Sequence, residues 1–288
     1  MRLAGLDSYD RSGFVSAPLA FTPYVGAFSV FLLVLALVTR RRVLVAVALV
    51  TVLAFGYALV PRVLGDPVGR PDLRVLTVNL RLGQASAPAV VALIRQSRPD
   101  VVSLQELTPG AVARLDAAGL ASVLPFRALS PLSGASGTGL LARYPLTAPG
   151  NVDQRSTFLM TTAVLRVPGH GPVTLVAVHT SPPIPGSAAG RWQRDFALLP
   201  HAGSGAAVLA GDYNATLDHA PLRSLIGTGY ADAAAASGHG FVRSWPTDKW
   251  LPPVTIDHVL IRGLHAFTVR GVTIPNTDHR ALLADLSW

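Results

Sequence analysis

The sequence predicts an α+β protein in which two packed β-sheets are flanked by helices, a four-layer αββα sandwich, and a two-helix transmembrane hairpin precedes it. The composition is 50% hydrophobic and 14% charged, whereas soluble domains carry about 25% charged residues. Long apolar runs occupy the N-terminal region. Further along, short strand-like segments outnumber helical ones, and adjacent strands alternate with β-α-β units, which favours two stacked sheets.

Charged residues are missing from two stretches, between Arg11 and Arg40 and between Arg42 and Arg62. A helix needs about 20 residues to cross a ~30 Å hydrocarbon core, so the first stretch is long enough and the second lies at the short end. Both are apolar on every face, which favours spanning helices over a buried helical hairpin in a soluble protein. A cleavable signal peptide fits less well, because the apolar material is too long.

We therefore predict an N-terminal membrane region over residues 1–64, with spans at about 17–39 and 43–61. The arginines Arg40–Arg42 lie between the spans, and positively charged turns stay on the cytoplasmic side. The remaining chain is then extracytoplasmic, and the protein is a multi-pass protein of the plasma membrane. Residues 1–14 resemble an outside loop, which leaves open a start further upstream with one more span.

Residues 65–72 are rich in turn formers and are interpreted as a linker to a catalytic domain over 73–288. Leu73–Asn79 alternates like a strand, and Ser86 caps a helix with an early proline that runs to about Ser97. Further strands are predicted at about 100–105, 121–129, 139–143, 157–167, 172–179, 206–211, 254–262, 266–273 and 280–287, and further helices from 108 to near 119, near 187–199 and after 218.

The charge pattern limits the choice of partners. The net charge is +8, but Lys249 is the only lysine and Glu106 the only glutamate. Residues 72–288 hold 17 basic and 13 acidic residues, an excess too small to indicate a strong phosphate-tracking surface. Duplex DNA is therefore a less favoured substrate. Because cysteine is absent, disulfides and thiolate metal sites are excluded.

Polar clusters end or follow six of the predicted strands. Such strand ends can bring side chains from distant parts of the sequence together. The set contains oxygen ligands and histidines but no sulfur, which suits Mg²⁺ or Mn²⁺ and a phosphate partner, and zinc fits less well. The clusters are Asn79, Gln105–Glu106, His179, Gly211–Asn214, Ile256–His258 and Thr277–Arg280.

Each cluster also has a structural interpretation. Asn79 can close a strand, Asp212 and Asn214 can form an Asx turn, and a lone His179 is commonly a structural histidine. Glu106 stands out, because it is the only glutamate and closes an apolar strand.

The other histidines are predicted to be structural or peripheral. His258 adjoins Asp257 on a strand and should face the opposite way, so we interpret it as structural. Five histidines have no usable spacing and are predicted to be surface or loop residues: His170, His201, His219, His239 and His265.

Taken in order, the clusters resemble the endonuclease/exonuclease/phosphatase superfamily over roughly residues 72–288. The matching stretches are LRVLTVNL, RPDVVSLQEL, GTGLLARYPL, VTLVAVHT, VLAGDYNAT, TIDHVLI and NTDHRALLADL. The succession of GDYN, TIDHV and TDHR is the most specific part. The resemblance implies a two-sheet fold and metal-dependent hydrolysis of a phosphodiester or phosphomonoester, with Mg²⁺ or Mn²⁺ as cofactor.

The resemblance also implies a role for each residue. Glu106 looks like the metal-binding carboxylate, with Asn79 and Asp278 close to the ion. In the catalytic set, Asp212 resembles the residue that orients or deprotonates the attacking water, and Asn214 would hold a phosphate oxygen. The remaining members are His279, backed by Asp257, for phosphate binding and proton transfer, and His179, for stabilising the phosphate or the leaving oxygen.

Some positions depart from the family pattern. Ala177 stands where an asparagine often precedes the mid-chain histidine, and Arg81 stands where some abasic-site nucleases carry an acid. The domain is small for the family, so inserted DNA-gripping loops are not expected.

Two classes of function stay open. In the first, the protein is an enzyme that acts on extracellular nucleic acid, a phospholipid head group or a soluble phosphoester. The membrane tether favours lipid, and no protein partner is evident. In the second, it is an inert membrane-bound recognition module that retains the fold. Such a module should have lost Glu106, Asp212 or His279, and all three are present, which favours the enzyme.

Overall fold

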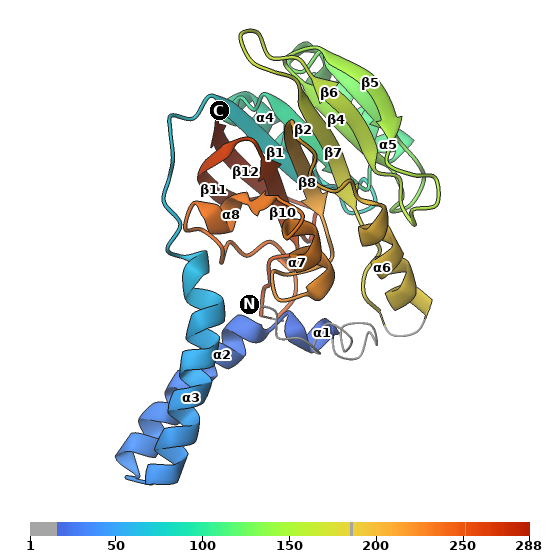
Figure 1. Ribbon diagram of the computed structural model, residues 1–288. Coiled ribbons are helices and arrows are strands. Elements are labelled where there is room, and N and C mark those ends of the chain that lie inside the picture. Colours follow the sequence, from blue (N-terminus) through green and yellow to red (C-terminus); the bar gives the residue numbers. More distant parts are fainter. Residues whose placement is uncertain (1–15, 185–186, 251) are drawn as a thin grey trace.

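The computed structural model describes residues 16–184, 187–250 and 252–288. It consists of a two-layered β-sandwich with helices on both outer faces and a helical hairpin that projects from one end (Figure 1). The predicted sandwich of two packed sheets flanked by helices is therefore confirmed.

The hairpin forms from the two apolar runs. Helix α2 (Thr22–Val38) and helix α3 (Arg42–Leu59) pack against each other, and Arg40 in the turn between them has a left-handed backbone with φ of 53°. The 3-10 turn η2 (Val60–Arg62) extends α3.

The first predicted span, 17–39, differs from the structure. It is divided into α1 (Ser16–Leu19) and the 17-residue α2, with a break next to Pro23, because proline cannot continue a helix beyond its first turn. At 1.5 Å per residue, α2 is about 25 Å long, shorter than a hydrocarbon core. Among the described residues, one helix, Arg42–Arg62, has the length and apolar composition to cross a membrane.

Each sheet has six strands and mixed direction. In sheet order, the first sheet comprises β11 (His265–Thr273), β12 (Arg280–Ser287), β1 (Leu73–Asn79), β2 (Val101–Gln105), β4 (Thr138–Ala142) and β3 (Phe126–Ser130). The second comprises β5 (Leu146–Asn151), β6 (Thr161–Leu165), β7 (Val173–His179), β8 (Ala206–Asp212), β10 (Asp257–Arg262) and β9 (Ala231–Asp232).

Three apolar clusters hold the four layers together. The central one joins both sheets and includes Val75, Val208 and Leu282. A second lies between the first sheet and helices α4 (Ala87–Ser97) and α5 (Pro109–Ala117). The third lies between the second sheet and helices α6 (Ser187–Leu198) and α7 (Ala220–Ile226). Because a fully buried leucine or valine contributes about 1.5–3 kcal/mol, these clusters dominate the stability of the domain.

Strand direction gathers the polar clusters at one end. The parallel pairs β1–β2 and β7–β8 bring the carboxyl ends of four strands together, and the antiparallel strands β4, β10 and β12 begin at the same end. We call this the site end and the opposite one the far end. The site is therefore a product of sheet topology.

Several element boundaries differ from the sequence prediction. The strand predicted at 157–167 covers only β6, and β5 was not predicted because its exposed edge contains Pro149 and Gly150, which weaken a strand pattern. The segment 121–129 divides into the 3-10 turn η3 (Leu120–Ser122) and β3. Ala233–Ala236, where no helix was predicted, forms helix α8, capped by Asp232.

Candidate functional site

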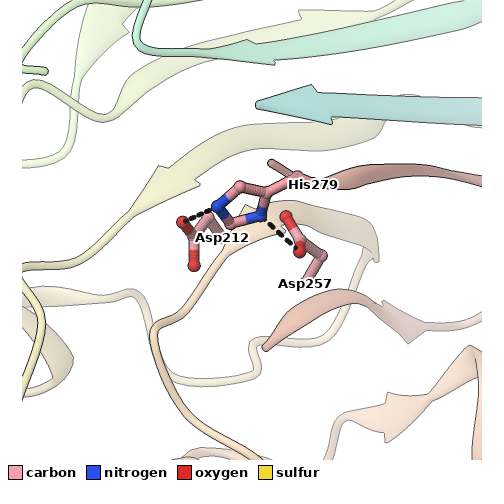
Figure 2. Close-up of side chains that lie close together, drawn as sticks. All are labelled: Asp212, Asp257 and His279. Carbon is pink, nitrogen blue, oxygen red and sulfur yellow. Dashed lines mark hydrogen bonds and ion pairs between the residues drawn. The ribbon is translucent and has the colours of Figure 1, made fainter. Parts of the chain in front are cut away.

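A buried triad of ionisable side chains forms the centre of the site end (Figure 2). Asp212 ends β8 and Asp257 begins β10, and the two are directly paired in the antiparallel ladder. His279 precedes β12 in the other sheet, and its Nδ1 lies 2.9 Å from Asp257 Oδ2. Its Nε2 lies 3.7 Å from Asp212 Oδ2. The predicted pairing of His279 with Asp257 is therefore present in the fold.

A second group of side chains surrounds the other side of Asp212. Asn79 Nδ2 donates to Glu106 Oε1 over 3.1 Å and to Asp212 Oδ2 over 3.0 Å. His179, the register neighbour of Asp212 across β7–β8, places Nε2 3.9 Å from both carboxylates. Glu106 Oε2 also accepts the Leu82 backbone N–H. The predicted residues from β1, β2, β7 and β8 thus lie around one small volume.

The backbone near the site has unusual conformations. Glu106 and Asn214 have φ of 55° and 47°, in the left-handed region that non-glycine residues rarely adopt. Such strain concentrates at functional sites, and here it turns both side chains towards neighbouring strand ends. Gly211 allows the close approach of β7 and β8, because a Cβ there would lie 1.9 Å from the Val178 carbonyl oxygen.

Asn214 lies directly beside Asp212, whereas Asp278 lies at the edge of the site. The backbone N–H of Asn214 donates to Asp212 Oδ1, an Asx-type turn, while its side-chain amide donates to the Thr180 carbonyl oxygen. Asp278 is half-buried at the edge of the site. Its Oδ2 accepts from Trp245 Nε1 over 3.1 Å, and its Oδ1 lies 3.8 Å from Arg81 Nε. Asp278 therefore contacts Trp245 and Arg81 rather than the carboxylate of Glu106.

Burial and mutual charge shift the protonation of the central groups. Burial, followed by the charge of Asp257, raises the pKa of Asp212. Burial and the nearby His279 lower the pKa of His179 to about 3, so His179 is neutral at pH 7. Burial lowers the pKa of His279, but the charges of Asp257 and Asp212 outweigh it and raise the pKa to about 10. His279 is therefore a cation that partly neutralises two carboxylates.

His258 has the structural position that its place on the strand predicts. It is buried on the other side of β10, with Nδ1 2.8 Å from Asp232 Oδ2 and Nε2 2.9 Å from the Ala215 carbonyl oxygen. Both nitrogens face acceptors, so both carry protons. Burial lowers the pKa of His258, but the hydrogen bond to Asp232 and the charge of Asp232 together outweigh burial, so the pKa is raised above its usual value.

One of the five histidines predicted to be surface or loop residues lies in a loop but is not at the surface. His170, His201, His239 and His265 are exposed, as expected. His219 is buried instead. Its Nδ1 accepts from the Thr216 N–H, and its Nε2 donates to the Ser16 carbonyl oxygen. The N-terminal segment covers this histidine, a long-range contact that the sequence pattern does not reveal.

Two further residues, Trp245 and Phe158, belong to the site without having been predicted, and Thr277 begins the predicted cluster Thr277–Arg280. Trp245 holds Asp278 and has its ring centroid 6.5 Å from that of His279. Phe158 stacks on His179 at 4.5 Å between centroids, and Thr277 Oγ1 donates to the Asn79 carbonyl oxygen. Thr277 was visible in the TDHR stretch, whereas Trp245 and Phe158 lie in loops without a recognisable spacing.

The donor set fits a hard divalent cation. In the triad, one polar atom of each side chain lies within 4.8 Å of the others. Because protonated His279 has no lone pair for a metal, the donors are the carboxylates of Asp212 and Asp257, and Glu106 lies one hydrogen bond away through Asn79. Two carboxylates buried this closely repel each other unless a cation is near, and oxygen-rich sites suit Mg²⁺ or Mn²⁺. Glu106, the predicted ligand, accepts from Asn79 and from the Leu82 N–H, and Asp257 accepts from His279, so each carboxylate keeps oxygen lone pairs for a cation.

Comparison with solved structures shows the same fold. An endonuclease/exonuclease/phosphatase from Beutenbergia cavernae DSM 12333 is 22% identical over 76% of this chain and 72% of its own, with a TM-score of 0.59. Humanized D. rerio TDP2 is 15% identical over 75% of this chain and 99% of its own, also with a TM-score of 0.59. D. rerio TDP2 complexed with single strand DNA product has a TM-score of 0.56, at 14% identity over 75% of this chain and 99% of its own.

The sequence comparisons give one match and one negative result. No curated protein matches the chain significantly. The sequence model of one family matches residues 76–279, from β1 through His279. Because this match covers well over half of the chain and includes the triad of buried ionisable residues, the protein belongs to the Endonuclease/Exonuclease/phosphatase family.

Proposed function

We propose that the protein is a divalent-metal-dependent phosphoesterase, anchored in the plasma membrane by its N-terminal hairpin, with the catalytic domain outside. The observation that carries the catalytic part is the convergence of Asn79, Glu106, His179, Asp212 and His279 on one volume, with contacts of 3.0–3.9 Å between neighbours. An inert recognition module has no need to retain buried, mutually repelling carboxylates, which cost stability.

The chain's own residues support hydrolysis by water. A carboxylate at Asp212, fixed by the Asn79 amide and the Asn214 N–H, is positioned to orient a water and accept its proton. Water oxygen then bonds to phosphorus, the ester P–O bond breaks, and the leaving oxygen takes a proton from the cationic His279. Neutral His179 and the Asn214 amide are donors for a phosphate oxygen.

A cation would be held by Glu106, with Asn79 and Asp278 near it. When bound, it would neutralise the charge that develops on the phosphate oxygens. Mg²⁺ and Mn²⁺ fit this oxygen-rich donor set. With the cation present, the carboxylate form of Asp212 is also favoured, because a nearby positive charge lowers the pKa of an acid.

The membrane part rests on the hairpin. Most large apolar side chains of α2 and α3 are exposed, including Phe31, Val38, Val43 and Tyr57, an arrangement that water does not favour. Arg40–Arg42 at the turn favour a cytoplasmic turn, which puts the domain outside. Although α2 is short, helices can be accommodated by local thinning of the bilayer.

The test is hydrolysis of bis(p-nitrophenyl) phosphate by the purified full chain with Mg²⁺, with Mn²⁺ and with EDTA. We expect turnover that EDTA abolishes and that Asp212→Asn lowers by roughly a hundredfold or more, in the range of general-base effects. Asp116→Asn is the matched control, because Asp116 is partly exposed and pairs with Arg127 away from the site. Equal activity of both variants, or activity in EDTA, would contradict the proposal.

A further inference from the structure

Exposed apolar side chains of the catalytic domain concentrate at the site end. Among its described residues, Trp250 is 91% exposed and Ile184 57%, and Leu82 and Leu132 are each 48% exposed. We call these four residues the rim. Two other large apolar side chains in the described part of the domain are exposed. Phe241, at 39%, lies beside the hairpin, and Phe126, at 37%, lies at the far end at the start of β3.

Every rim residue lies on a loop next to a site residue. Leu82 follows β1 and donates its N–H to Glu106. The Leu132 N–H donates to the carbonyl oxygen of Leu107, the residue after Glu106. Ile184 follows β7, and Trp250 lies in the loop that Trp245 begins beside His279. The rim residues therefore lie on four separate loops at the site end.

The hairpin is fixed to this same end by three separate contacts. Ser16 Oγ donates to the Pro183 carbonyl oxygen, beside Ile184, and Tyr24 Oη donates to the Pro253 carbonyl oxygen over 2.6 Å. Arg62 forms two hydrogen bonds to Asp218 at 3.0 and 2.6 Å, and both side chains are about nine-tenths buried. A cavity of about 300 Å³ lies at this junction, away from the triad.

The path of the chain between the hairpin and the domain determines which end of the sandwich lies next to the hairpin. From Arg62 the chain runs along the side of the sandwich to the far end. There the Val68 carbonyl oxygen accepts from Ser287 Oγ, and the Asp72 N–H donates to the Leu286 carbonyl oxygen. Strand β1 then returns towards the hairpin, which projects from the lower end in Figure 1, while the C-terminus lies at the upper end. The carboxyl ends of the strands thus point towards the hairpin.

We propose that the site end faces the outer surface of the membrane that holds the hairpin, that the rim contacts the lipid interface, and that the substrate is a phosphoester in a lipid head group. The proposal rests on the proposed function for the membrane anchor and the hydrolytic site. Tryptophan is enriched at membrane interfaces, and the large apolar side chains of α2 and α3 are exposed like those of the rim. Lys249, 5.1 Å from the Trp245 ring, adds a cation suited to phosphate.

The orientation can be tested without any activity measurement, by spin labels on introduced cysteines. Because the chain contains no cysteine of its own, each label attaches at one chosen position. Trp250→Cys, Ile184→Cys and the far-end control Phe126→Cys are spin-labelled in the full chain, in nanodiscs of phosphatidylcholine, phosphatidylethanolamine and phosphatidylglycerol. We expect labels at 250 and 184 to be more accessible to oxygen than to an aqueous nickel chelate, and the label at 126 to show the reverse. Equal aqueous accessibility at all three positions would overturn the orientation.

The substrate class is tested by comparing two phosphodiesters. The nanodisc lipids supply the head-group ester, and bis(p-nitrophenyl) phosphate supplies a soluble one. We expect Trp250→Ala combined with Ile184→Ala to lower lipid hydrolysis by about tenfold, the effect of a lost contact worth ~1.4 kcal/mol, with soluble turnover unchanged, and Phe126→Ala to change neither. Soluble turnover without lipid hydrolysis, or equal losses on both, overturns the lipid substrate. Inactivity on both overturns the proposed function, and the spin labels still decide the orientation.

Discussion

The effect of breaking the His279–Asp257 pair can be predicted by comparison with a second histidine–aspartate pair in the same domain, His258–Asp232. Both pairs are buried, and both join a histidine Nδ1 to an aspartate Oδ2, at 2.9 Å for His279–Asp257 and 2.8 Å for His258–Asp232. Only His279 also faces Asp212, at 3.7 Å. Loss of either pair should therefore cost stability, whereas only loss of the first should cost turnover per folded molecule.

The magnitude follows from the geometry. A hydrogen bond to a charged group contributes about 1.5–3 kcal/mol, and removing one partner of a buried charged pair costs up to about 3–5 kcal/mol. We expect Asp257→Asn and Asp232→Asn to lower the free energy of unfolding by similar amounts in that range. In the proposed mechanism, Asp257 orients and charges the group that protonates the leaving oxygen. Asp257→Asn should therefore also lower kcat/KM by roughly a hundredfold, ~2.7 kcal/mol of transition-state stabilisation.

The assay measures kcat/KM on bis(p-nitrophenyl) phosphate and the thermal midpoint for Asp257→Asn, His279→Ala and the double variant. The corresponding Asp232 and His258 variants are the controls. If His279 and Asp257 act as one unit, the double variant should be little worse than the more damaged single one. Strictly additive losses in log kcat/KM would refute the reasoning, as would a folded His279→Ala with full activity.

Three other predictions concern the pKa of His279, the role of Glu106 as a metal ligand and the membrane topology. In the metal-free protein, NMR titration should show the His279 ring protonated throughout the neutral range, because the Asp257 and Asp212 charges raise its pKa to about 10. Since this value exceeds the unfolded value of about 6.5, the pair stabilises the fold fully below about pH 6.5, and that contribution is lost as the pH approaches 10; a His279 pKa near 6.5 would contradict this. Glu106→Gln should lower turnover at limiting Mg²⁺ by at least about a hundredfold with little change in thermal midpoint, because the Glu106 carboxylate contacts polar groups of the site rather than the apolar core. Near-normal turnover would show that Glu106 is not a ligand. A reporter fused after Trp288 should be active only when exported, and a cytoplasmic signal would overturn the topology.

The amino-acid sequence predicted the parts of the fold that depend on local pattern. Alternation in Leu73–Asn79 predicted β1 with its observed bounds, and Ser86 with the following proline predicted α4. Where burial is one-sided or absent, the prediction failed. Strand β5 is exposed along most of its length and does not alternate, so the physical signal of a core-facing strand is missing there.

The site shows the same division between local and long-range information. Asn79, Glu106, His179, Asp212 and His279 were selected because each lies next to a predicted strand and because the order of the clusters resembles a known family. Their roles as ligand, base or donor stay predictions until the variants are measured. The positions of Trp245 and Phe158 depend on loop paths, which no periodicity specifies.

Sequence by itself indicated, through the order of its polar clusters and their family resemblance, which side chains belong to the site, and through hydrophobic length that two apolar runs form helices, because motif order and hydrophobic length are properties of the chain before it folds. Only the tertiary structure decided which face of the domain the hairpin meets. That choice depends on contacts between residues more than 150 positions apart, Arg62 with Asp218 and Ser16 with Pro183, and on a linker that crosses the whole domain before β1 begins. Such contacts arise from packing and charge pairing between surfaces that exist only after folding.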